Sequence, residues 1–549
     1  MASDDVKSII DHESVLRGKR SNFENWWQQI AYRVRPAEAQ FTTITEQGEK
    51  RTERLFHSGA AIANERFAAV LEDLLTPRNQ IWHALTLEDE NEELSKDSEV
   101  ARYLERLNKL LHSVRYRPKA NYAGQKAMSY LDVGSFGNAA MFVDEEVGVG
   151  PTYMHVPLRE CVWAHDASGN IDTVYRRYTL QARQAAQLAA KKGWTLPEKI
   201  AKAANDQPFQ EFEFLHCVRP NDDRVASRLD YRGMQWSSYV VACDAKQLVH
   251  AGGFTSWPWA ISRYLLAGGE TYARSPAMAA WPAILTLNEE KKTILRAGQR
   301  AVEPPILLTE DGALEPFNLQ NGALNPGLVS EDGRPLALPF QTGGDIPLGL
   351  ELMALEQQSV DDSFLVSVFK ILAENPQMTA TQVLEIAQVK ATLLAPVMGR
   401  IQGEDLGKQI DREIDILAKQ SRYAWIEQEM PDALREAGGR YKVDYRSALS
   451  RAMRAQEGVA ILRTFEAAPS AIALDQDAGL VLDVPEAFRE LANINGVPAK
   501  LLRDAKTVAA LKAQKAEANQ AAQIASVAPE ISQAMLNASK AEALRTGAA

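Results

Sequence analysis

The stretch RSPAMAAWPAILTLNEEKKTILRAGQRAVEPP, residues 274–305, decides the fold. Ser275 is a favourable N-cap, and Pro276 suits the first helical position because its missing N–H would have no partner there. We expect one helix from Ser275 to about Ala301, in which Pro282 is either tolerated or moves the start by one turn. Its apolar residues recur mostly at helical spacing and are Met278, Trp281, Ile284, Leu285, Ile294 and Leu295.

An insert separates this helix from a second one. Pro304 and Pro305 end the first helix, and a stretch of extended character, rich in glycine, proline and aspartate, follows to about Pro347. A second helix is then expected from about Leu348 to Leu372, again from apolar residues at helical spacing. Two helices on either side of a compact insert indicate a structural scaffold that lines or surrounds another structure. They do not resemble a catalytic motif.

A long third helix follows a short break. Thr379 and Gln382 fit a capping box at its start. Apolar residues at helical spacing continue to Leu417, and Pro396 among them should kink the helix. About forty residues at about 1.5 Å each would span roughly 60 Å, so the helix should connect separate parts of the molecule. The break before it contains Glu374, Asn375, Pro376 and Gln377.

The segments before residue 271 predict an α+β region. Two short helices are expected at the N-terminus, over Ser3 to Arg17 and from Ser21 to just before Pro36. After further helices, the apolar period changes to that of strands at Ala139, and one hairpin is expected around Asp244-Ala245-Lys246. The chain beyond residue 440 is predicted to be mostly helical.

Composition limits the possible classes of protein. The chain has 549 residues, of which 46% are hydrophobic and 24% charged, as in ordinary globular proteins. No apolar run approaches the roughly 20 residues that a membrane span needs, and the N-terminal sequence MASDD is not a signal peptide. Three widely spaced cysteines favour a reducing cytoplasm over a disulfide framework. The net charge of −11 is unlike that of a protein that binds duplex DNA tightly, although solubility explains the acidity equally well.

Motifs for catalysis are absent from the sequence. There is no P-loop, no GxSxG elbow and no HExxH pair. His155 and His165 flank Cys161 on strands that we expect to be adjacent, but such histidines are more often core or surface residues than metal ligands. A metal-dependent nuclease would need carboxylates, and the cluster Asp144, Glu145 and Glu146 offers them, although such clusters are more often solvated turns. We therefore predict no enzyme, no metal and no cofactor.

Several segments, taken in order, resemble those of the head-to-tail connector (portal) proteins of short-tailed, podovirus-type bacteriophages. Residues 130–145, YLDVGSFGNAAMFVDE, are similar to a glycine-containing strand entry of that family. Residues 269–276, GETYARSP, resemble its GE-x-YGRSP helix start, with Ala273 in place of the usual glycine. The two consecutive prolines after the helix match as well.

Two later segments extend the resemblance over nearly the whole chain. Residues 378–383, MTATQV, are similar to the family's MTATEV, and Gln382 can serve the capping box as the acid would. Residues 443–452 resemble a late family segment but lack its proline. Each pattern is weak alone, whereas their order and intervals together make a strong signal.

The resemblance implies a portal fold of the α+β class, mainly α, with wing, stem, clip and crown regions that assembles as a ring. The tunnel loop would place Glu374, Asn375, Pro376 and Gln377 toward a channel, while Ser275, Pro276, Thr379 and Gln382 would start and cap helices and Pro396 would kink the wing helix. The implied regions are 1–270, wing; 271–303, first stem helix; 304–347, clip; 348–372, second stem helix; 373–378, tunnel loop; 379–440, kinked wing helix and return; and 441–549, a mostly helical crown.

The implied function is a ring, usually of twelve subunits, at one vertex of the capsid. Double-stranded DNA would pass through it without sequence specificity, during packaging by the terminase and later during ejection. Further implied partners are the terminase large subunit, a tail adaptor, and the major capsid and scaffolding proteins, with no membrane. The protein would belong to the virion, after assembly in the host cytoplasm.

Two alternatives remain open at this point. One is a head-completion adaptor or internal scaffold, although adaptors are generally much shorter than this chain. The other is a metal-dependent phage nuclease built on Asp144, Glu145 and Glu146.

Overall fold

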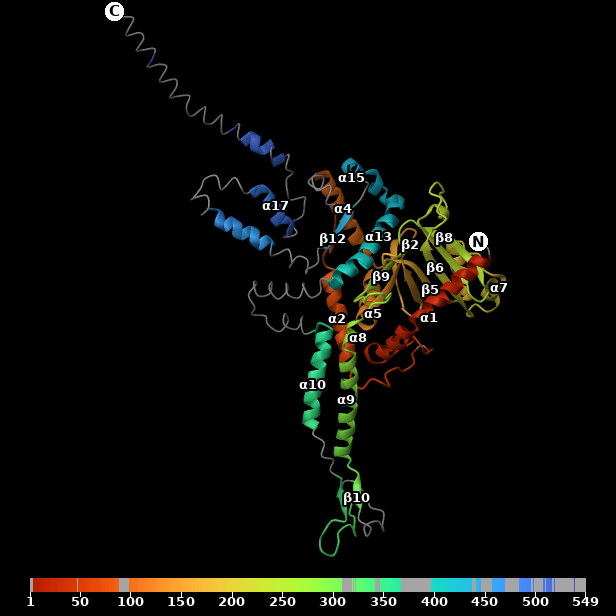
Figure 1. The fold of residues 1–549 in the computed structure, drawn as a ribbon, viewed down its shortest axis with the longest axis vertical. Helices are drawn as coiled ribbons and strands as arrows, with labels where there is room; N and C mark the ends of the chain where they lie inside the picture. Colours follow the sequence, from red (N-terminus) through yellow and green to blue (C-terminus); the bar gives the residue numbers. More distant parts are fainter. Residues whose placement is uncertain are drawn as a thin grey trace, which may run out of the picture. The chain divides into compact units, whose positions relative to one another are not determined.

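The chain forms two compact units that do not follow its order. The first comprises Met1–Trp82, Leu111–Ala424 and Ser447–Leu449, and the second comprises His83–Leu110, Trp425–Arg446 and Ser450–Ala549. Residues 83–110, which are within the range expected for the wing, group with the C-terminal part of the chain. The computed structural model (Figure 1) describes residues 3–46, 48–87, 98–308, 318, 320, 322–340, 346–366, 396–436, 441–445, 457–469, 483–494, 497, 507–508, 510–515, 518 and 538.

A three-stranded antiparallel sheet of order β3-β2-β9 forms one part of the first unit. The first six residues of β2 and all of β9 are buried, and the sheet contributes apolar residues such as Met141 and Val143 to a core cluster. Ile416, from a helix far along the sequence, belongs to the same core cluster. The strands are β2 (Asn138–Glu146), β3 (Gly150–Val156) and β9 (Trp259–Arg263).

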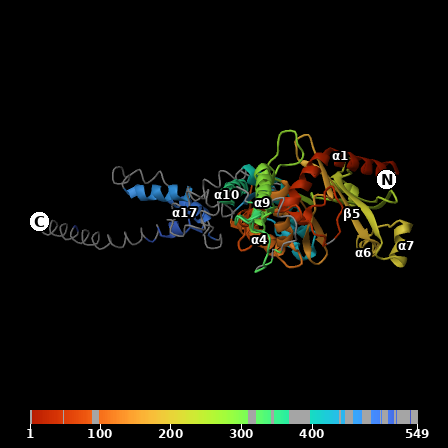
Figure 2. The same ribbon diagram turned by 90° about the horizontal axis from the view of Figure 1, so that it is seen from below.

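A five-stranded antiparallel sheet of order β4-β5-β6-β7-β8 forms another part of the same unit. The hairpin expected around Asp244-Ala245-Lys246 joins β7 to β8, and Lys246 takes the left-handed conformation that a tight turn requires (φ 49°). Helices α6 (Ala182–Lys192) and α7 (Glu198–Asp206) pack together beside β5 (Figure 2). The strands are β4 (Cys161–His165), β5 (Ile171–Gln181), β6 (Glu211–Pro220), β7 (Trp236–Ala242) and β8 (Gln247–Phe254).

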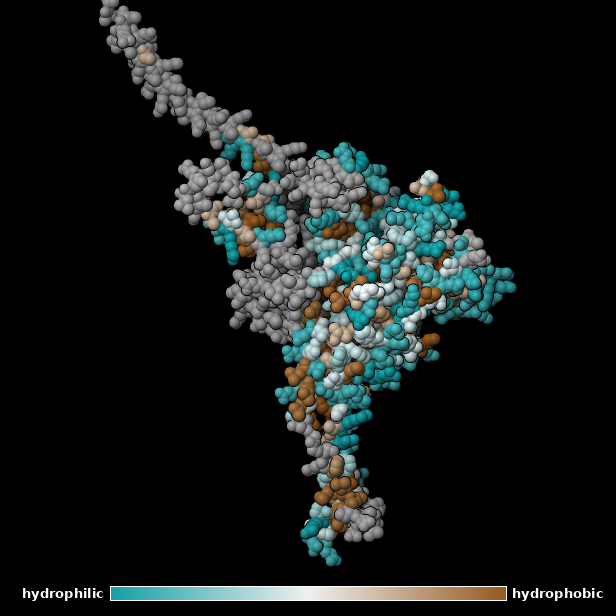
Figure 3. Space-filling model, in the orientation of Figure 1, coloured by the Kyte–Doolittle hydropathy of each residue, from teal (hydrophilic) through white to brown (hydrophobic). Residues whose placement is uncertain are grey.

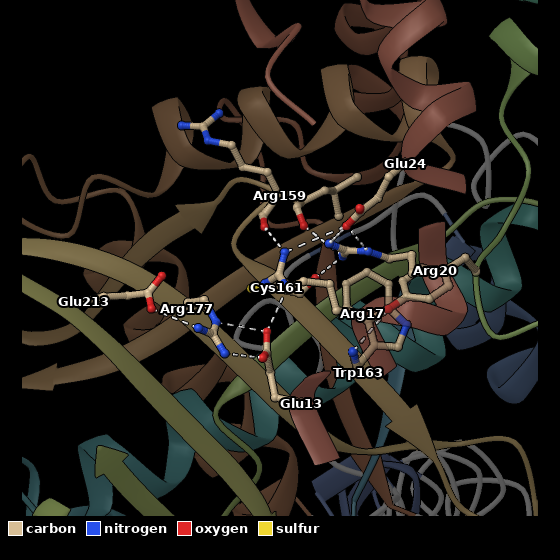
Figure 4. Close-up of polar contacts among 11 residues, drawn as sticks. Glu13, Arg17, Arg20, Glu24, Arg159, Cys161, Trp163, Arg177 and Glu213 are labelled. Carbon is tan, nitrogen blue, oxygen red and sulfur yellow. Dashed lines mark hydrogen bonds and ion pairs between the residues drawn. The ribbon is translucent and has the colours of Figure 1, made fainter. Parts of the chain in front are cut away.

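The N-terminus forms one helix, α1 (Ser3–Val34), where two short helices were expected. The prediction of a break around residues 18–20 was wrong because Arg20, fully buried, is held inside a continuous helix. Its guanidinium donates to the backbone carbonyl of Leu158 at 2.9 Å and to Glu24 at 3.0 Å (Figure 4). Glu13 bonds Arg177 of β5 in the same view, so charged residues fix α1 to the sheet.

Further helices complete the first unit, and some of them pack against these sheets. Helix α5 contacts both β2 and α2, and it ends at Gly137, whose left-handed backbone (φ 75°) forms the turn into β2. Two 3-10 turns, η1 (Pro36–Glu38) and η3 (Tyr231–Gly233), lie in loops. The helices are α2 (Gly59–Leu75), α5 (Tyr122–Phe136), α8 (Pro276–Ala279), α9 (Trp281–Val302), α10 (Ile346–Ser363) and α13 (Lys408–Ala418).

The second unit is organised by a strand pair that joins distant parts of the chain. β1 (His83–Leu87) and β12 (Tyr441–Tyr445) run antiparallel, with Leu85 opposite Val443. Asn108 of α4 (Ser98–Arg115) accepts a hydrogen bond from the backbone of Leu85 at 3.0 Å. The other elements described after residue 420 are short or helical: η6 (Ser421–Tyr423), which lies in the first unit, α14 (Trp425–Gln428), α15 (Asp432–Glu436), residues 457–469 and α17 (Val484–Ile494).

Candidate functional site

The start of the first stem segment is fixed to the corner between α5 and β2. Ser275 Oγ accepts from the backbone N–H of Met278 at 3.0 Å and donates to the carbonyl of Ser135 at 2.9 Å. The Asn138 side chain bonds both backbone groups of Ala273, each at 2.9 Å. A Cβ on Gly137 would lie 2.6 Å from the carbonyl carbon of residue 274, so the close approach needs glycine.

The first stem segment is interrupted near its start. Pro276 is the first residue of α8, which ends at Ala279, and α9 begins at Trp281 with Pro282 at its second position. The expected single helix from Ser275 is therefore two, because a proline ring clashes with the carbonyl four residues earlier and has no N–H to donate. The shift of one turn that Pro282 allowed is the observed outcome, and α9 then continues to Val302.

Helices α9 and α10 form an antiparallel hairpin, which we call the stem hairpin (Figure 1). Gly349 faces Ile294, and a Cβ at residue 349 would approach the Ile294 side chain to 3.1 Å, so glycine permits close packing. At its base the buried Asn288 side chain accepts from the backbone of Phe56 at 2.8 Å and donates to the carbonyl of Arg54 at 3.1 Å. These bonds attach the stem hairpin to the loop before α2.

The second stem helix ends earlier than predicted. α10 stops at Ser363, nine residues before the expected end at Leu372, and Leu365 adopts a left-handed conformation (φ 58°). The fully buried Phe364 packs against Phe67 of α2 with ring centroids 6.2 Å apart, so a tertiary contact accompanies this interruption of the helix. Val366 is helical again, and residues 367–372 of the expected helix lie outside the described residues. The residues predicted for the tunnel loop, Glu374, Asn375, Pro376 and Gln377, and the predicted capping pair, Thr379 and Gln382, lie outside the described residues.

The stem hairpin exposes a row of leucines. Leu348, Leu352 and Leu355 are 45–60% exposed and share one face of α10, because residues four and seven apart lie on the same side of a helix. Figure 3 shows hydrophobic residues gathered over α10 and over the β10 hairpin below it. Large apolar side chains exposed together on a folded chain mark an interaction surface.

The segment between the stem helices contains a small antiparallel hairpin, which we call the clip hairpin. Its strands are β10 (Ile306–Leu308) and β11 (Ala337–Pro339). Leu307 lies opposite Leu338 in the register, and both side chains are more than half exposed. The extended character expected for the insert is thus present in its described part, and the clip hairpin adds to the exposed apolar surface of the stem hairpin.

Charged side chains on α9 do not all find partners within the stem hairpin. Lys292 bonds Glu289 one turn away at 3.3 Å. Burial, together with the nearby Glu356 carboxylate, raises the pKa of Glu290, so two like charges face each other between α9 and α10. The stem hairpin of one chain is therefore incomplete in its electrostatics as well as in its apolar contacts.

The described part of the third helix begins at Pro396 and contains a π turn, η5 (Gln402–Gly407), before α13. Buried residues recur at every fourth position from Val397 to Glu413. In a regular α-helix such a series drifts by about 40° per step, or about 160° over sixteen residues. The wider π turn takes up one extra residue, which keeps these side chains on one face. The kink predicted at Pro396 depends on residues before it, outside the described chain.

This face carries buried ion pairs that the sequence analysis missed. Lys126 of α5 donates to Asp405 at 2.5 Å, and Arg115 makes two bonds to Glu413, at 3.0 and 2.5 Å. Burial lowers the pKa of Lys126 more than the Asp405 carboxylate raises it. Burial also lowers the pKa of Arg115, but the Glu413 carboxylate has the larger effect, so the pKa of Arg115 is raised. A signal existed in the sequence: Asp405, Gln409 and Glu413 interrupt the apolar stripe at intervals of four.

The residues considered for metal or nuclease chemistry either lie on different sheets or are paired with other side chains. His155 lies on β3 and His165 on β4, which belong to different sheets, so the expectation of adjacent strands was wrong. His155 Nε2 bonds the buried Asp132 at 2.6 Å. Asp144 and Glu146 form ion pairs with lysines of α6. Among the described residues no group of three or more His, Cys, Asp or Glu could hold a metal ion, and no helix among them is long and apolar enough to cross a membrane.

Known proteins match this chain over most of its length. The chain is 23% identical over 541 residues to the portal protein of Salmonella phage epsilon15, covering 95% of this chain and 93% of the relative. It is 24% identical over 531 residues to the probable portal protein of Bordetella phage BPP-1, with the same two coverages.

Two solved structures are more distant. The neck of an empty gene transfer agent particle is 13% identical, covers 75% of this chain and 85% of its own, and has a TM-score of 0.34. The virion of the native gene transfer agent is 12% identical, covers 73% and 93%, and has the same TM-score, and no conclusion rests on either. Residues 7–502, by contrast, match one family throughout, and the chain belongs to the bacteriophage head to tail connecting proteins.

Proposed function

We propose that this member of the head-to-tail connecting family is a portal subunit, which forms a ring at one capsid vertex. The observation that carries the ring is the row of exposed leucines on α10, because a chain that worked alone would gain stability by covering them. The names of the two phage relatives support the portal assignment. Twelve subunits are expected from the family resemblance.

In this proposal the regions keep the boundaries expected from the sequence, with two refinements. The first stem segment consists of α8 and α9, and the second stem helix ends at Ser363. Residues 304–347 form the clip, 373–378 the tunnel loop, and 379–440 the kinked wing helix and its return, whose described part includes η5 and α13. The crown lies within the C-terminal residues from 441 onward.

The ring would guide double-stranded DNA without holding it. A chain with a net charge of −11 repels phosphates, and phosphate neutralisation supplies most of the affinity of non-specific DNA binding. The role is structural, and ATP hydrolysis belongs to the terminase. The partners of the ring are the terminase large subunit, a tail adaptor, and the capsid and scaffolding proteins. It is incorporated into the virion after assembly in the host cytoplasm.

Electron microscopy of the purified protein tests the ring directly. End views should average to a ring of about twelve subunits around a central hole. A uniform monomer or dimer that persists at high protein concentration, with scaffolding protein added as well, would contradict the proposal. Assembled rings should also bind a short DNA duplex only weakly at low salt, and nanomolar affinity would contradict the repulsive channel.

The tunnel loop has its own test. Deleting residues 374–377 should leave rings intact by electron microscopy, while phage that carry the deletion should package or retain less DNA. A matched deletion of residues 222–225, in the loop after β6, controls for the loss of four residues. Normal packaging by the 374–377 deletion would show that this segment is not the tunnel loop.

A further inference from the structure

Three cations and three aromatic rings form a connected series where α1, the loop before α2 and α9 meet. Each cation lies over one ring, at 4.5–5.4 Å from the ring centre, which is the range of cation–π contacts. The series runs from α9 through the last turn of α1 and the loop, and returns to α9. We call it the cation–aromatic patch, and its pairs are Arg33 over Trp281, Arg54 over Tyr32 and Lys292 over Phe56.

A buried asparagine fixes the loop residues of the patch to α9. The Asn288 side chain, which is 4% exposed, accepts from the backbone N–H of Phe56 at 2.8 Å and donates to the carbonyl of Arg54 at 3.1 Å. The backbone of the loop is therefore held in place by hydrogen bonds. The side chains of the same two residues remain accessible, since Arg54 is exposed and Phe56 is 38% exposed.

Like charges lie close together in the patch. Burial lowers the pKa of Arg33, and the neighbouring Arg54 guanidinium lowers it further, while the Glu289 carboxylate has the opposite effect. That carboxylate already bonds Lys292 at 3.3 Å. A further anion at the patch would offset the repulsion between the two arginines.

The rings of the patch favour an anion that carries no bases. Proteins bind single-stranded nucleic acids by stacking the bases on aromatic rings. Here a cation lies over each of the three rings, which leaves less aromatic surface on which a base can stack. A guanidinium stacked on a ring keeps its N–H edge available, and this edge matches the two oxygens of a carboxylate.

The charge around the patch favours a short anionic segment. Residues 31–34, 54–57 and 281–292 contain four basic and two acidic side chains, a net charge of +2, whereas the whole chain has a net charge of −11. A DNA duplex carries phosphates along its entire length, and those beyond the patch would meet a protein that repels them. A few aspartates or glutamates would meet the basic residues alone.

We propose that the cation–aromatic patch binds the carboxylates of an acidic segment from a different protein. The Arg54 guanidinium would donate two hydrogen bonds to one carboxylate, and Arg33 and Lys292 would add favourable charge. The exposed part of the Phe56 ring would pack against the aliphatic part of the segment. The inference does not depend on the ring, because a single chain forms the whole patch.

Peptide binding to a charge-deficient variant tests the patch. The double variant Arg33→Gln with Arg54→Gln removes two charges and both guanidinium groups. The matched control is Arg232→Gln, which removes an exposed arginine that lies over Tyr231, 5.9 Å from the ring centre and outside the patch. The probe is a fluorescein-labelled peptide, Ser-Glu-Asp-Gly-Glu-Asp-Ser, whose fluorescence anisotropy is measured with the full-length protein at low salt. The amide peptide Ser-Gln-Asn-Gly-Gln-Asn-Ser controls for charge.

The wild type and Arg232→Gln should bind the acidic peptide alike, and the double variant should bind it about tenfold more weakly because charge-assisted hydrogen bonds are lost. Arg54→Lys keeps the charge without the paired N–H groups, and its affinity should fall between these two. The wild type should bind the amide peptide much more weakly than the acidic one. Equal binding of the acidic peptide by the double variant, or no binding by the wild type, would overturn the proposal. If thermal melting shows that the double variant is unfolded, Arg54→Lys decides in its place, and unchanged affinity in that variant would overturn the proposal.

Other occupants of the patch give different results. A short DNA duplex, added at the same concentration of negative charge as the peptide, should displace little of it. Complete displacement would assign the patch to nucleic acid and overturn the proposal. Mass photometry should show the same oligomers for the double variant and the wild type. Loss of rings in the double variant alone would assign the patch to a second copy of this chain, which also overturns the proposal. If no sample formed rings but the peptide bound as expected, only the proposed ring would be wrong.

Cross-linking locates the peptide on the wild-type protein. A carbodiimide joins a carboxylate to a lysine amine as an amide and takes up the water that is released. Mass spectrometry of the digested protein should find the peptide on Lys291 or Lys292. Lys191 and Lys192 of α6, which are paired with acidic side chains, are the internal control. Cross-links mainly at these two control lysines would place the peptide elsewhere and refute the proposal.

Discussion

The part of the proposed wing around α13 and the stem hairpin belong to one compact unit, but they differ in which side chains are buried and which are exposed. On the α13 face of the wing, charges are buried and paired: the Arg115 and Glu413 side chains are 0% and 1% exposed. On the stem hairpin, apolar groups are exposed and uncovered, with Leu355 at 60%. The charges around α13 are paired within a single chain, whereas the stem hairpin leaves large apolar side chains exposed, which in the proposed ring a neighbouring subunit would cover.

Buried charges and exposed apolar side chains both raise the free energy of a folded chain unless other contacts offset them. A buried charge is tolerated only when it is paired and hydrogen-bonded, and Glu413 accepts from Arg115, Tyr153 and Gln409. In the proposed ring, assembly would cover the exposed leucine row. Changes in the wing should therefore alter the stability of the monomer, and changes in the stem hairpin should alter association.

The largest expected effect is in the wing. Glu413→Ala leaves the Arg115 guanidinium buried without its partner, which should cost about 3–5 kcal/mol of unfolding free energy. Urea denaturation below the concentration at which rings form measures it. The control is Glu72→Ala, which breaks an ion pair with the largely exposed Arg78 and should cost less than about 1 kcal/mol. Equal losses would mean that burial does not distinguish the two pairs.

The second expected effect concerns assembly. Replacing both Leu352 and Leu355 by lysine should abolish rings in electron microscopy, because two charges would be buried against a neighbouring chain. The melting temperature of the monomer should hardly change. The control is Glu351→Lys, at an exposed position on the same helix. Rings formed by the double variant would place the subunit contact elsewhere.

A smaller effect should appear as a function of pH. Burial lowers the pKa of His216, which bonds Ser238 inside the five-stranded sheet at 2.9 Å, to about 3. The unfolded chain binds a proton near this histidine's ordinary pKa of 6.5, but the folded chain does not. Stability should therefore decline as pH falls from about 6.5 toward 3. Melting curves of the wild type and His216→Gln over this range check it, and the variant should lose less stability.

The smallest effect should be found between the stem helices. Glu290→Gln removes the repulsion with Glu356 and should raise the melting temperature slightly at pH 7. The gain should shrink as pH falls, because the raised pKa means that Glu290 is protonated early in the folded chain. Glu289→Gln is the control: it loses its bond to Lys292 and should give no gain. A loss of stability in Glu290→Gln would show that the charge is favourable.

Much of the stem could be predicted because its signals are local. Ser275 and Pro276 start a helix by their own chemistry, and the two prolines at 304–305 end one. The break at Ala280 was one of two outcomes that Pro282 allowed. The early end of α10 could not be predicted, since it depends on where Phe364 packs.

The buried ion pairs could not be assigned from the sequence. Lys126 and Asp405 are separated by 279 positions, and the local sequence around either residue does not indicate the other as its partner. The same is true of the pairing of β1 with β12, which moves residues 83–110 into the second unit. Each isolated segment looked like part of an ordinary amphipathic element.

The sequence by itself determined the start of the first stem segment at Ser275 and Pro276, which residues carry the family resemblance, and that no catalytic motif is present in it. These features depend on residues that are close together in the sequence. Their identity and spacing determine local backbone hydrogen bonds and the apolar face of each element. Only the tertiary structure decided which charges are buried together and which leucines of α10 remain exposed. These depend on contacts between residues far apart in the chain, because burial and hydrogen-bond partners exist only once the chain has folded.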